Sequence, residues 1–115
     1  MANIGGNITG IIQRKTGTTK NALGEAVPNY EDAFSTVGWL GLQSGEYKRS
    51  TFFAKIEESS HVFLCDYHAG IYALAAEDTR MVIKGFLYDV LLIDNPDEMD
   101  EQLEIYLRRV GAVSG

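Results

Sequence analysis

The sequence predicts an all-β protein, a small six-stranded β-barrel with a long loop between its second and third strands. Segments rich in β-branched and aromatic residues recur along the 115 residues, and turn residues separate them at short intervals. Residues 43–60 lie between two such segments and form a far longer connection than a hairpin needs. Closing the sheet into a barrel would also remove exposed edges that pair with other chains.

The first half of the chain contains two predicted strands. Residues 7–15 (NITGIIQRK) are rich in β-branched residues and form the first. A wide surface loop is expected over residues 16–30, because they include the turn formers Gly17, Asn21, Gly24 and Pro28. Residues 34–42 (FSTVGWLGL) form the second strand, and its two glycines indicate a bulge or a corner of the barrel.

The second half contains the remaining strands. Residues 61–67 are apolar on both faces, which indicates burial on both sides or contact of one face with a partner. Residues 71–78 suit a single helical turn or an irregular segment. Residues 79–83 and 86–93 form a hairpin across the two-residue turn Lys84-Gly85, and residues 102–110 form the last strand. The residues expected in the core are Trp39, Leu64, Tyr88, Val90, Leu92 and Ile105.

The bulk composition excludes several classes of protein. With 115 residues, the chain is expected to form one domain with flexible ends at residues 1–6 and 112–115. A net charge of −6 argues against tight binding of nucleic acid through the general surface. The single cysteine, the absence of a secretory signal and the absence of a membrane-length apolar run indicate synthesis in a reducing cytoplasm, with no membrane partner.

The long segment 43–60 is the candidate functional site. It combines apolar side chains with basic ones and ends in two acids, and Ser44 is a candidate N-cap for a short helix within it. Exposed apolar clusters usually mark a contact surface. The segment is therefore either a lid helix folded over the barrel or an arm that meets neighbouring copies or a channel. The contact residues expected are Tyr47, Lys48, Arg49, Phe52, Phe53, Lys55, Ile56, Glu57 and Glu58.

The residues that carry enzymatic or metal chemistry in other proteins do not form a convincing site here. Cys65 has two histidines, His61 and His68, near it, but a four-ligand metal site would also need Asp66, which points to the opposite face of the strand. Cys65 lies in an apolar strand, where a thiol is usually inert. The acidic residues 97–101 suit a solvated turn, with weak binding of a divalent cation as the alternative. No enzymatic activity, cofactor or structural metal is expected.

Short motifs over residues 8–109 resemble the phage head–tail joining family, the head-closure or stopper proteins. These motifs are Ile11-Ile12-Gln13-Arg14, Leu23-Gly24-Glu25, Tyr30-Glu31-Asp32, Val37-Gly38-Trp39, Ser44-Gly45-Glu46 and the YDVLLIDNPD run at 88–97. The resemblance implies a ring of about twelve barrels in the virion, between the portal–adaptor and the tail. It also implies that segment 43–60 closes the DNA channel after packaging. Asp66 stands where many members have a basic residue, so no contact of that basic residue is expected.

Two other functions remain open from the sequence. One is a tail terminator or another neck ring protein, which size and composition do not distinguish from a stopper. The other is a single-stranded nucleic-acid-binding barrel, in which aromatic side chains stack on bases within a basic groove. The stacking would come from Trp39, Tyr47, Phe52 and Phe53, and the charge from Lys48, Arg49 and Lys55.

Overall fold

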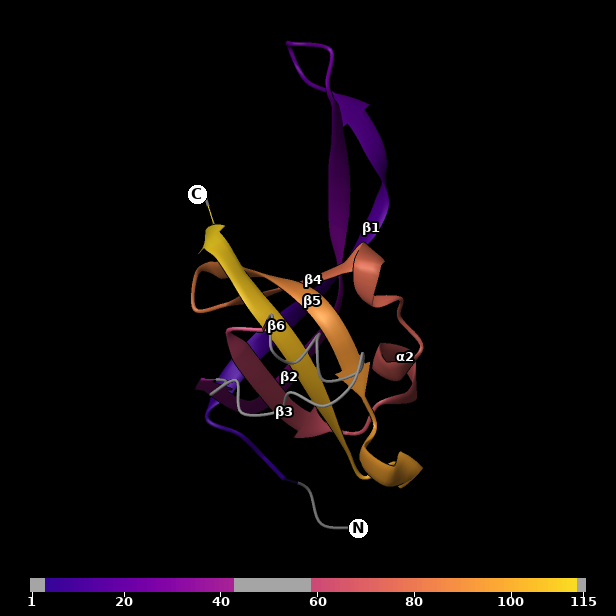
Figure 1. The fold of residues 1–115 in the computed structure, drawn as a ribbon, viewed down its shortest axis with the longest axis vertical. Helices are drawn as coiled ribbons and strands as arrows, with labels where there is room; N and C mark the ends of the chain where they lie inside the picture. Colours follow the sequence, from indigo (N-terminus) through magenta and orange to yellow (C-terminus); the bar gives the residue numbers. More distant parts are fainter. Residues whose placement is uncertain (1–3, 43–58, 114–115) are drawn as a thin grey trace.

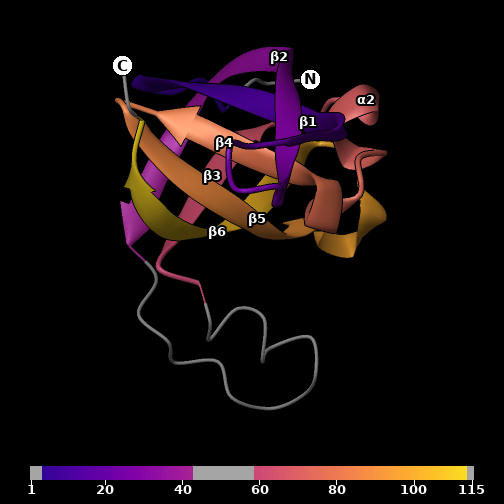
Figure 2. The same cartoon turned by 90° about the horizontal axis from the view of Figure 1, so that it is seen from above.

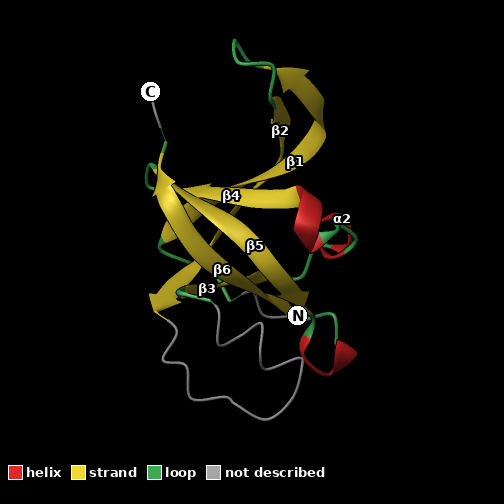
Figure 3. Cartoon of the chain, turned by 45° about the horizontal axis from the view of Figure 1, so that its top comes forward, coloured by secondary structure: helices red, strands yellow, loops and turns green. Residues whose placement is uncertain are grey.

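The computed structural model describes residues 4–42 and 59–113. Within these residues, six antiparallel strands close into a barrel in the order β1-β2-β3-β6-β5-β4, which confirms the predicted fold class (Figures 1 and 3). The strands are β1 (Ile8–Lys20), β2 (Ala26–Leu42), β3 (His61–Asp66), β4 (Thr79–Ile83), β5 (Phe86–Asp94) and β6 (Gln102–Ala112). Helix α2 (Ala69–Tyr72) and the 3-10 turns η1 (Ala76–Asp78) and η2 (Pro96–Glu98) connect them.

The strands surround a common interior (Figure 2), and the buried apolar side chains of the strands form the core there. In β3, His61, Phe63 and Cys65 are buried, whereas Val62 and Leu64 alternate with them and are only half-buried. The buried apolar cluster is made of Ile12, Phe63, Cys65, Ile71, Met81, Ile83, Tyr88, Val90, Leu103, Ile105 and Leu107. The expected core residues Tyr88, Val90 and Ile105 therefore lie in it.

Three of the expected core residues lie outside this cluster. Trp39 is 45% exposed and donates its indole N–H to the carbonyl of Ile4 at 2.9 Å. The prediction was wrong because Trp39 follows the inward-facing Gly38 and therefore points outward. Leu64 points outward for the same reason, between Phe63 and Cys65.

Leu92 lies outside the core because of a bulge in β5. The register with β6 shifts between Val90 and Leu92, so that Leu92 pairs with Tyr106, which alternates with Ile105 and Leu107 and is buried outside the core cluster. One extra residue reverses the alternation of a strand. Ile93 packs against the core instead.

Gly38 marks the close approach that the sequence predicts in β2. It pairs with Ile8 of β1 on one side and with Cys65 of β3 on the other. A Cβ atom at Gly38 would lie 2.3 Å from the carbonyl oxygen of Leu64 and 2.6 Å from the ring of Phe63. No other residue type fits there without moving the backbone.

Two short connections follow directly from local chemistry. His68 begins helix α2 because its Nδ1 accepts hydrogen bonds from the N–H groups of Gly70 and Ile71, and Ile71 then enters the core. The β4–β5 hairpin turns through Lys84 and Gly85, whose φ angles are 50° and 79°. Positive φ at both positions is the geometry of a type I′ turn, as expected for a two-residue hairpin.

The largest departure from the sequence prediction is at residues 16–30. These residues do not form a surface loop, because β1 continues to Lys20 and β2 begins again at Ala26. The two strands pair almost to their ends and rise beyond the barrel as a two-stranded ribbon (Figure 1). This ribbon extends the molecule to 48 × 31 × 23 Å.

Candidate functional site

The site residues predicted from the sequence, Tyr47 to Glu58 in segment 43–60, lie outside the residues that the structure describes. Its flanks are described. Ser60 donates its backbone N–H to the carbonyl of Leu107, and its hydroxyl accepts the N–H of Arg109 at 2.9 Å. The chain therefore returns to the barrel firmly bound to β6.

The described residues offer a second candidate site, the ribbon formed by residues 15–31, hereafter called the arm. Strand β4 pairs with β1 only as far as Arg14, so the barrel ends where the arm begins. Nearly every residue of the arm is exposed, on both faces of the ribbon. An isolated two-stranded ribbon is at best marginally stable in water, so an arm of this kind normally gains stability from a partner.

Both edges of the arm carry unpaired backbone groups. Among the described residues, β1 has no second strand partner along 15–20, and β2 has none along 26–37. An unpaired strand edge presents N–H and C=O groups that can add another strand. The barrel is closed, and the open edges are concentrated on the arm.

The two strands of the arm carry opposite charges. The outgoing strand has Arg14 at its base followed by Lys15 and Lys20, and the returning side has Glu25, Glu31 and Asp32. Arg14 and Glu31 form an ion pair within the arm at 2.6 Å. Within the described ranges, Lys15 and Lys20 have no ion-pair partner. The outgoing edge is therefore basic and the returning side acidic.

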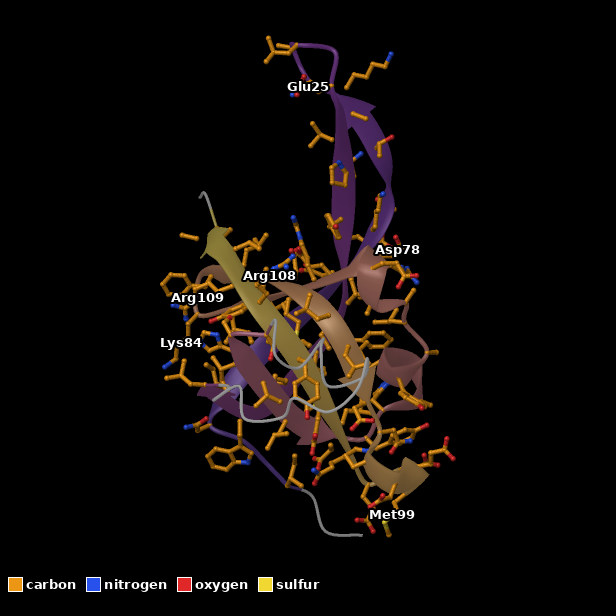
Figure 4. All side chains as sticks on the ribbon, in the orientation of Figure 1. Glu25, Asp78, Lys84, Met99, Arg108 and Arg109 are labelled. Atoms are coloured by element: carbon orange, nitrogen blue, oxygen red, sulfur yellow. The ribbon has the colours of Figure 1, made fainter. Side chains whose placement is uncertain are left out.

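The tip of the arm is a hydrogen-bonded turn. The side-chain oxygen of Asn21 accepts the backbone N–H groups of Leu23 and Glu25, at 2.9 and 3.0 Å. Its amide donates to the carboxylate of Glu25, which is labelled at the top of Figure 4. Gly24 completes the turn with a φ of 81°. This turn holds Leu23 outward with 83% of its surface exposed.

The base of the arm is fixed by side chains from three strands. Arg80 of β4 donates to the side-chain oxygen of Gln13 at 2.6 Å, and Gln13 donates in turn to Asp32 at 2.8 Å. The guanidinium of Arg80 also lies over the ring of Tyr30, 3.9 Å from its centroid. The arm is thereby held in a defined direction relative to the barrel.

Two bulges shape the ribbon. Ala33 is the extra residue on β2 where the register shifts after Ile12, and Thr16 is the extra residue on β1 before Gly17. A bulge bends its strand and increases the local twist. In the sequence, the only sign of the first bulge is the small residue Ala33, and the only sign of the second is the glycine that follows Thr16.

Burial shifts the pKa values of Cys65 and His61, two titratable groups of the barrel. Burial raises the pKa of the Cys65 thiol to about 11, and the charge of Asp66 acts in the same direction. Burial and then the charge of Arg109 lower the pKa of His61. Over residues 4–42 and 59–113, no three His, Cys, Asp or Glu side chains are grouped as metal ligands would be. Asp100, in the predicted acidic turn, exchanges hydrogen bonds with Asn95.

In the part of the chain that the structure describes, no helix is both long and apolar enough to cross a membrane.

The geometry defines a class of protein, a closed antiparallel barrel that carries one free-edged arm. No protein-family model matches the chain, and no curated protein matches its sequence. A similar solved chain belongs to a structure described as "Virion of native gene transfer agent (GTA) particle". The two chains superpose with a TM-score of 0.57 at 12% identity, over 92% of this chain and 96% of the other. At this identity the likeness shows a shared fold.

Proposed function

We propose that this chain is a structural protein of a phage-like virion, in which copies of the barrel assemble into a ring between head and tail. The observation that carries the proposal is the likeness to a chain of a gene transfer agent virion, which extends over nearly the whole of both chains. The resemblance to head–tail joining proteins, noted in the sequence, points to the same place in such a particle. The protein is proposed to act by assembly and not by catalysis.

Within that ring, the specific role proposed is head closure. The ring would contain about twelve copies, contact the portal–adaptor on one side and the tail on the other, and surround the path of the DNA. Segment 43–60, with Phe52 and Phe53 among its apolar residues, would close the channel after packaging. An acidic surface suits such a conduit, since like charge keeps a polyanion mobile.

The role is tested by particles that lack this chain. If the chain is a head-closure protein, particles without it should have heads that lose their DNA and unattached tails of normal length. A tail terminator, the alternative neck protein, predicts filled heads and tails of irregular length. Normal, complete particles without the chain would contradict both roles.

The gate is tested separately by shortening the segment. Deleting residues 47–58 should leave the barrel folded, since its strands and core lie outside the deletion. Particles containing the shortened chain are expected to join heads to tails yet lose their genomes on storage. The control is Asp97→Lys with Glu98→Lys in η2, outside both the segment and the arm, which should retain DNA. Equal retention of DNA by the wild-type, the shortened and the control particles would contradict the proposed gate.

A further inference from the structure

We propose that the arms of neighbouring copies pair edge to edge, with the outgoing edge of one arm (15–20) bound to the returning edge (26–31) of the next. The occupant of each free edge is thus a second copy of this chain. This inference rests on the proposed ring, and it names the surface that joins the copies.

The geometry of a ring makes this pairing antiparallel. The outgoing strand rises from the barrel and the returning strand descends to it (Figure 1). Rotation about an axis along the arms places the rising strand of one copy beside the descending strand of its neighbour. Antiparallel strands form the more favourable ladder, and unlike edges meeting head to tail continue around a closed ring.

The charges on the two edges match this arrangement. In the arm's own register, Lys20 lies opposite Ala26, and Lys15 lies opposite Tyr30. Rotation keeps every residue at its height for arms parallel to the axis. Lys20 of one copy therefore lies level with Ala26 of the next, one residue from Glu25, and Lys15 lies level with Tyr30, one residue from Glu31. The two lysines, which lack an ion-pair partner among the described residues, would each face a strand that has a carboxylate one residue away.

The pairing also explains how so exposed a ribbon is stabilised. Its strands have no buried face of their own, and two-stranded ribbons gain independent stability only when further strands or a packing surface are added. Edge pairing adds a strand on each side of every arm. The ordered turn at Asn21 and the fixed base at Arg80 hold the arm ready for this addition, which limits the entropy lost on assembly.

The test uses charge reversal on the full-length chain. Lys15→Glu with Lys20→Glu makes both sides of the arm acidic, and Glu25→Lys with Glu31→Lys makes both basic. Each double variant alone should associate about tenfold more weakly than the wild type in sedimentation velocity, because like charges then meet at every edge. A 1:1 mixture should recover association, since acidic and basic arms can alternate around an even-numbered ring.

A second mixture controls for net charge. Asp97→Lys with Glu98→Lys changes the charge equally at exposed positions of η2, beside Met99 at the end of the molecule away from the arm (Figure 4). When this control is mixed with the acidic-arm variant (Lys15→Glu with Lys20→Glu), association should not recover. Association by the acidic-arm variant equal to that of the wild type, or equal rescue by both mixtures, would overturn the proposal.

A cross-linking measurement keeps the test valid if a charge variant does not fold. Thr18 lies opposite Pro28 in the arm's register. A short bis-maleimide should join Thr18→Cys chains to Pro28→Cys chains in a mixture, while neither variant alone is joined to itself. Cys65 does not interfere, because it is fully buried. Self-linking of either variant would indicate a two-fold contact and overturn the proposal.

The arm pairing would also be overturned if wild-type chains stay monomeric, and mixed Thr18→Cys and Pro28→Cys chains stay uncross-linked, at every concentration tested. That result would leave the proposed virion role standing, because particles lacking the chain test that role independently.

Discussion

The guanidinium of Arg80 lies 3.9 Å above the ring of Tyr30, and this contact joins the barrel to the base of the arm. The same side chain donates to Gln13 at 2.6 Å, so one residue of β4 binds both strands of the arm where they leave the barrel. The contact is partly buried, where a cation–π interaction and a charged hydrogen bond each contribute more than on an open surface.

Replacing Arg80 should loosen the arm without unfolding the barrel. Arg80→Met removes the charge and the donor while keeping a long apolar side chain. We expect a loss of about 1–2 kcal/mol in the free energy of unfolding, and faster hydrogen exchange at the amides of 15–20. The control is Arg108→Met, which breaks an ion pair of half-exposed groups with Asp89 and should cost less than about 0.5 kcal/mol. Equal losses for the two variants would contradict the role given to Arg80.

Two glycines of β2 provide a matched pair for the close approach of β2 to β3. Gly38→Ala places a Cβ atom 2.3 Å from the carbonyl oxygen of Leu64, whereas the nearest atom to a Cβ at Gly41 is 4.0 Å away on Val62. We expect Gly38→Ala to destabilise the barrel by about 3 kcal/mol and Gly41→Ala to change stability little. Urea unfolding measures both. Similar unfolding midpoints would mean that the strands are not packed as described.

Asp94 and Glu104 form a like-charged cross-strand pair between β5 and β6. Burial first, and then the charges of Glu104 and Asp97, raise the pKa of Asp94. The folded state therefore binds this proton more tightly than the unfolded state does. The contribution of Asp94 to the free energy of unfolding falls as pH rises above about 4. Asp94→Asn should stabilise the protein by about 0.5 kcal/mol at pH 7, with the gain vanishing near pH 3.5. An unchanged difference at the two pH values would contradict this.

His61 should make stability depend on pH in the opposite direction. Its pKa is lowered by burial and by the charge of Arg109, and its ring contacts the ring of Tyr88 and the hydroxyl of Ser60. The unfolded state therefore takes up a proton more readily, so this contribution is complete above about pH 6.5 and is lost as pH falls toward the lowered pKa. His61→Gln should reduce the fall in unfolding free energy between pH 7.5 and 5. Parallel curves for the two proteins would rule out His61 as the cause.

The barrel could be predicted from the sequence because its strands have one buried face. Alternation along β6 and the Lys84-Gly85 turn located the last strands closely, since burial selects apolar residues at every second position. The same rule failed where a bulge reversed the alternation of inward and outward side chains. A bulge before Leu92 moved it out of the core, and nothing in the residue types marks that bulge.

The arm could not be predicted by the same reasoning. Its strands have no buried face, so residues 16–30 show no apolar alternation, and their glycines, asparagines and proline suggested a loop. The strand signal that remained was the β-branched and aromatic content at Thr18, Thr19, Val27 and Tyr30. In the proposed ring, the strands that stabilise the arm belong to neighbouring copies, and the sequence of one chain does not reveal them.

The most direct measurement of the central claim is a reconstruction of the assembled particle by electron cryomicroscopy. The proposal predicts a closed ring of these barrels at the junction of head and tail, with Lys15 and Lys20 of each arm beside the acidic strand of the next. Absence of the chain from that junction would contradict the proposed function. A ring in which the arms stand apart would contradict the pairing of their edges.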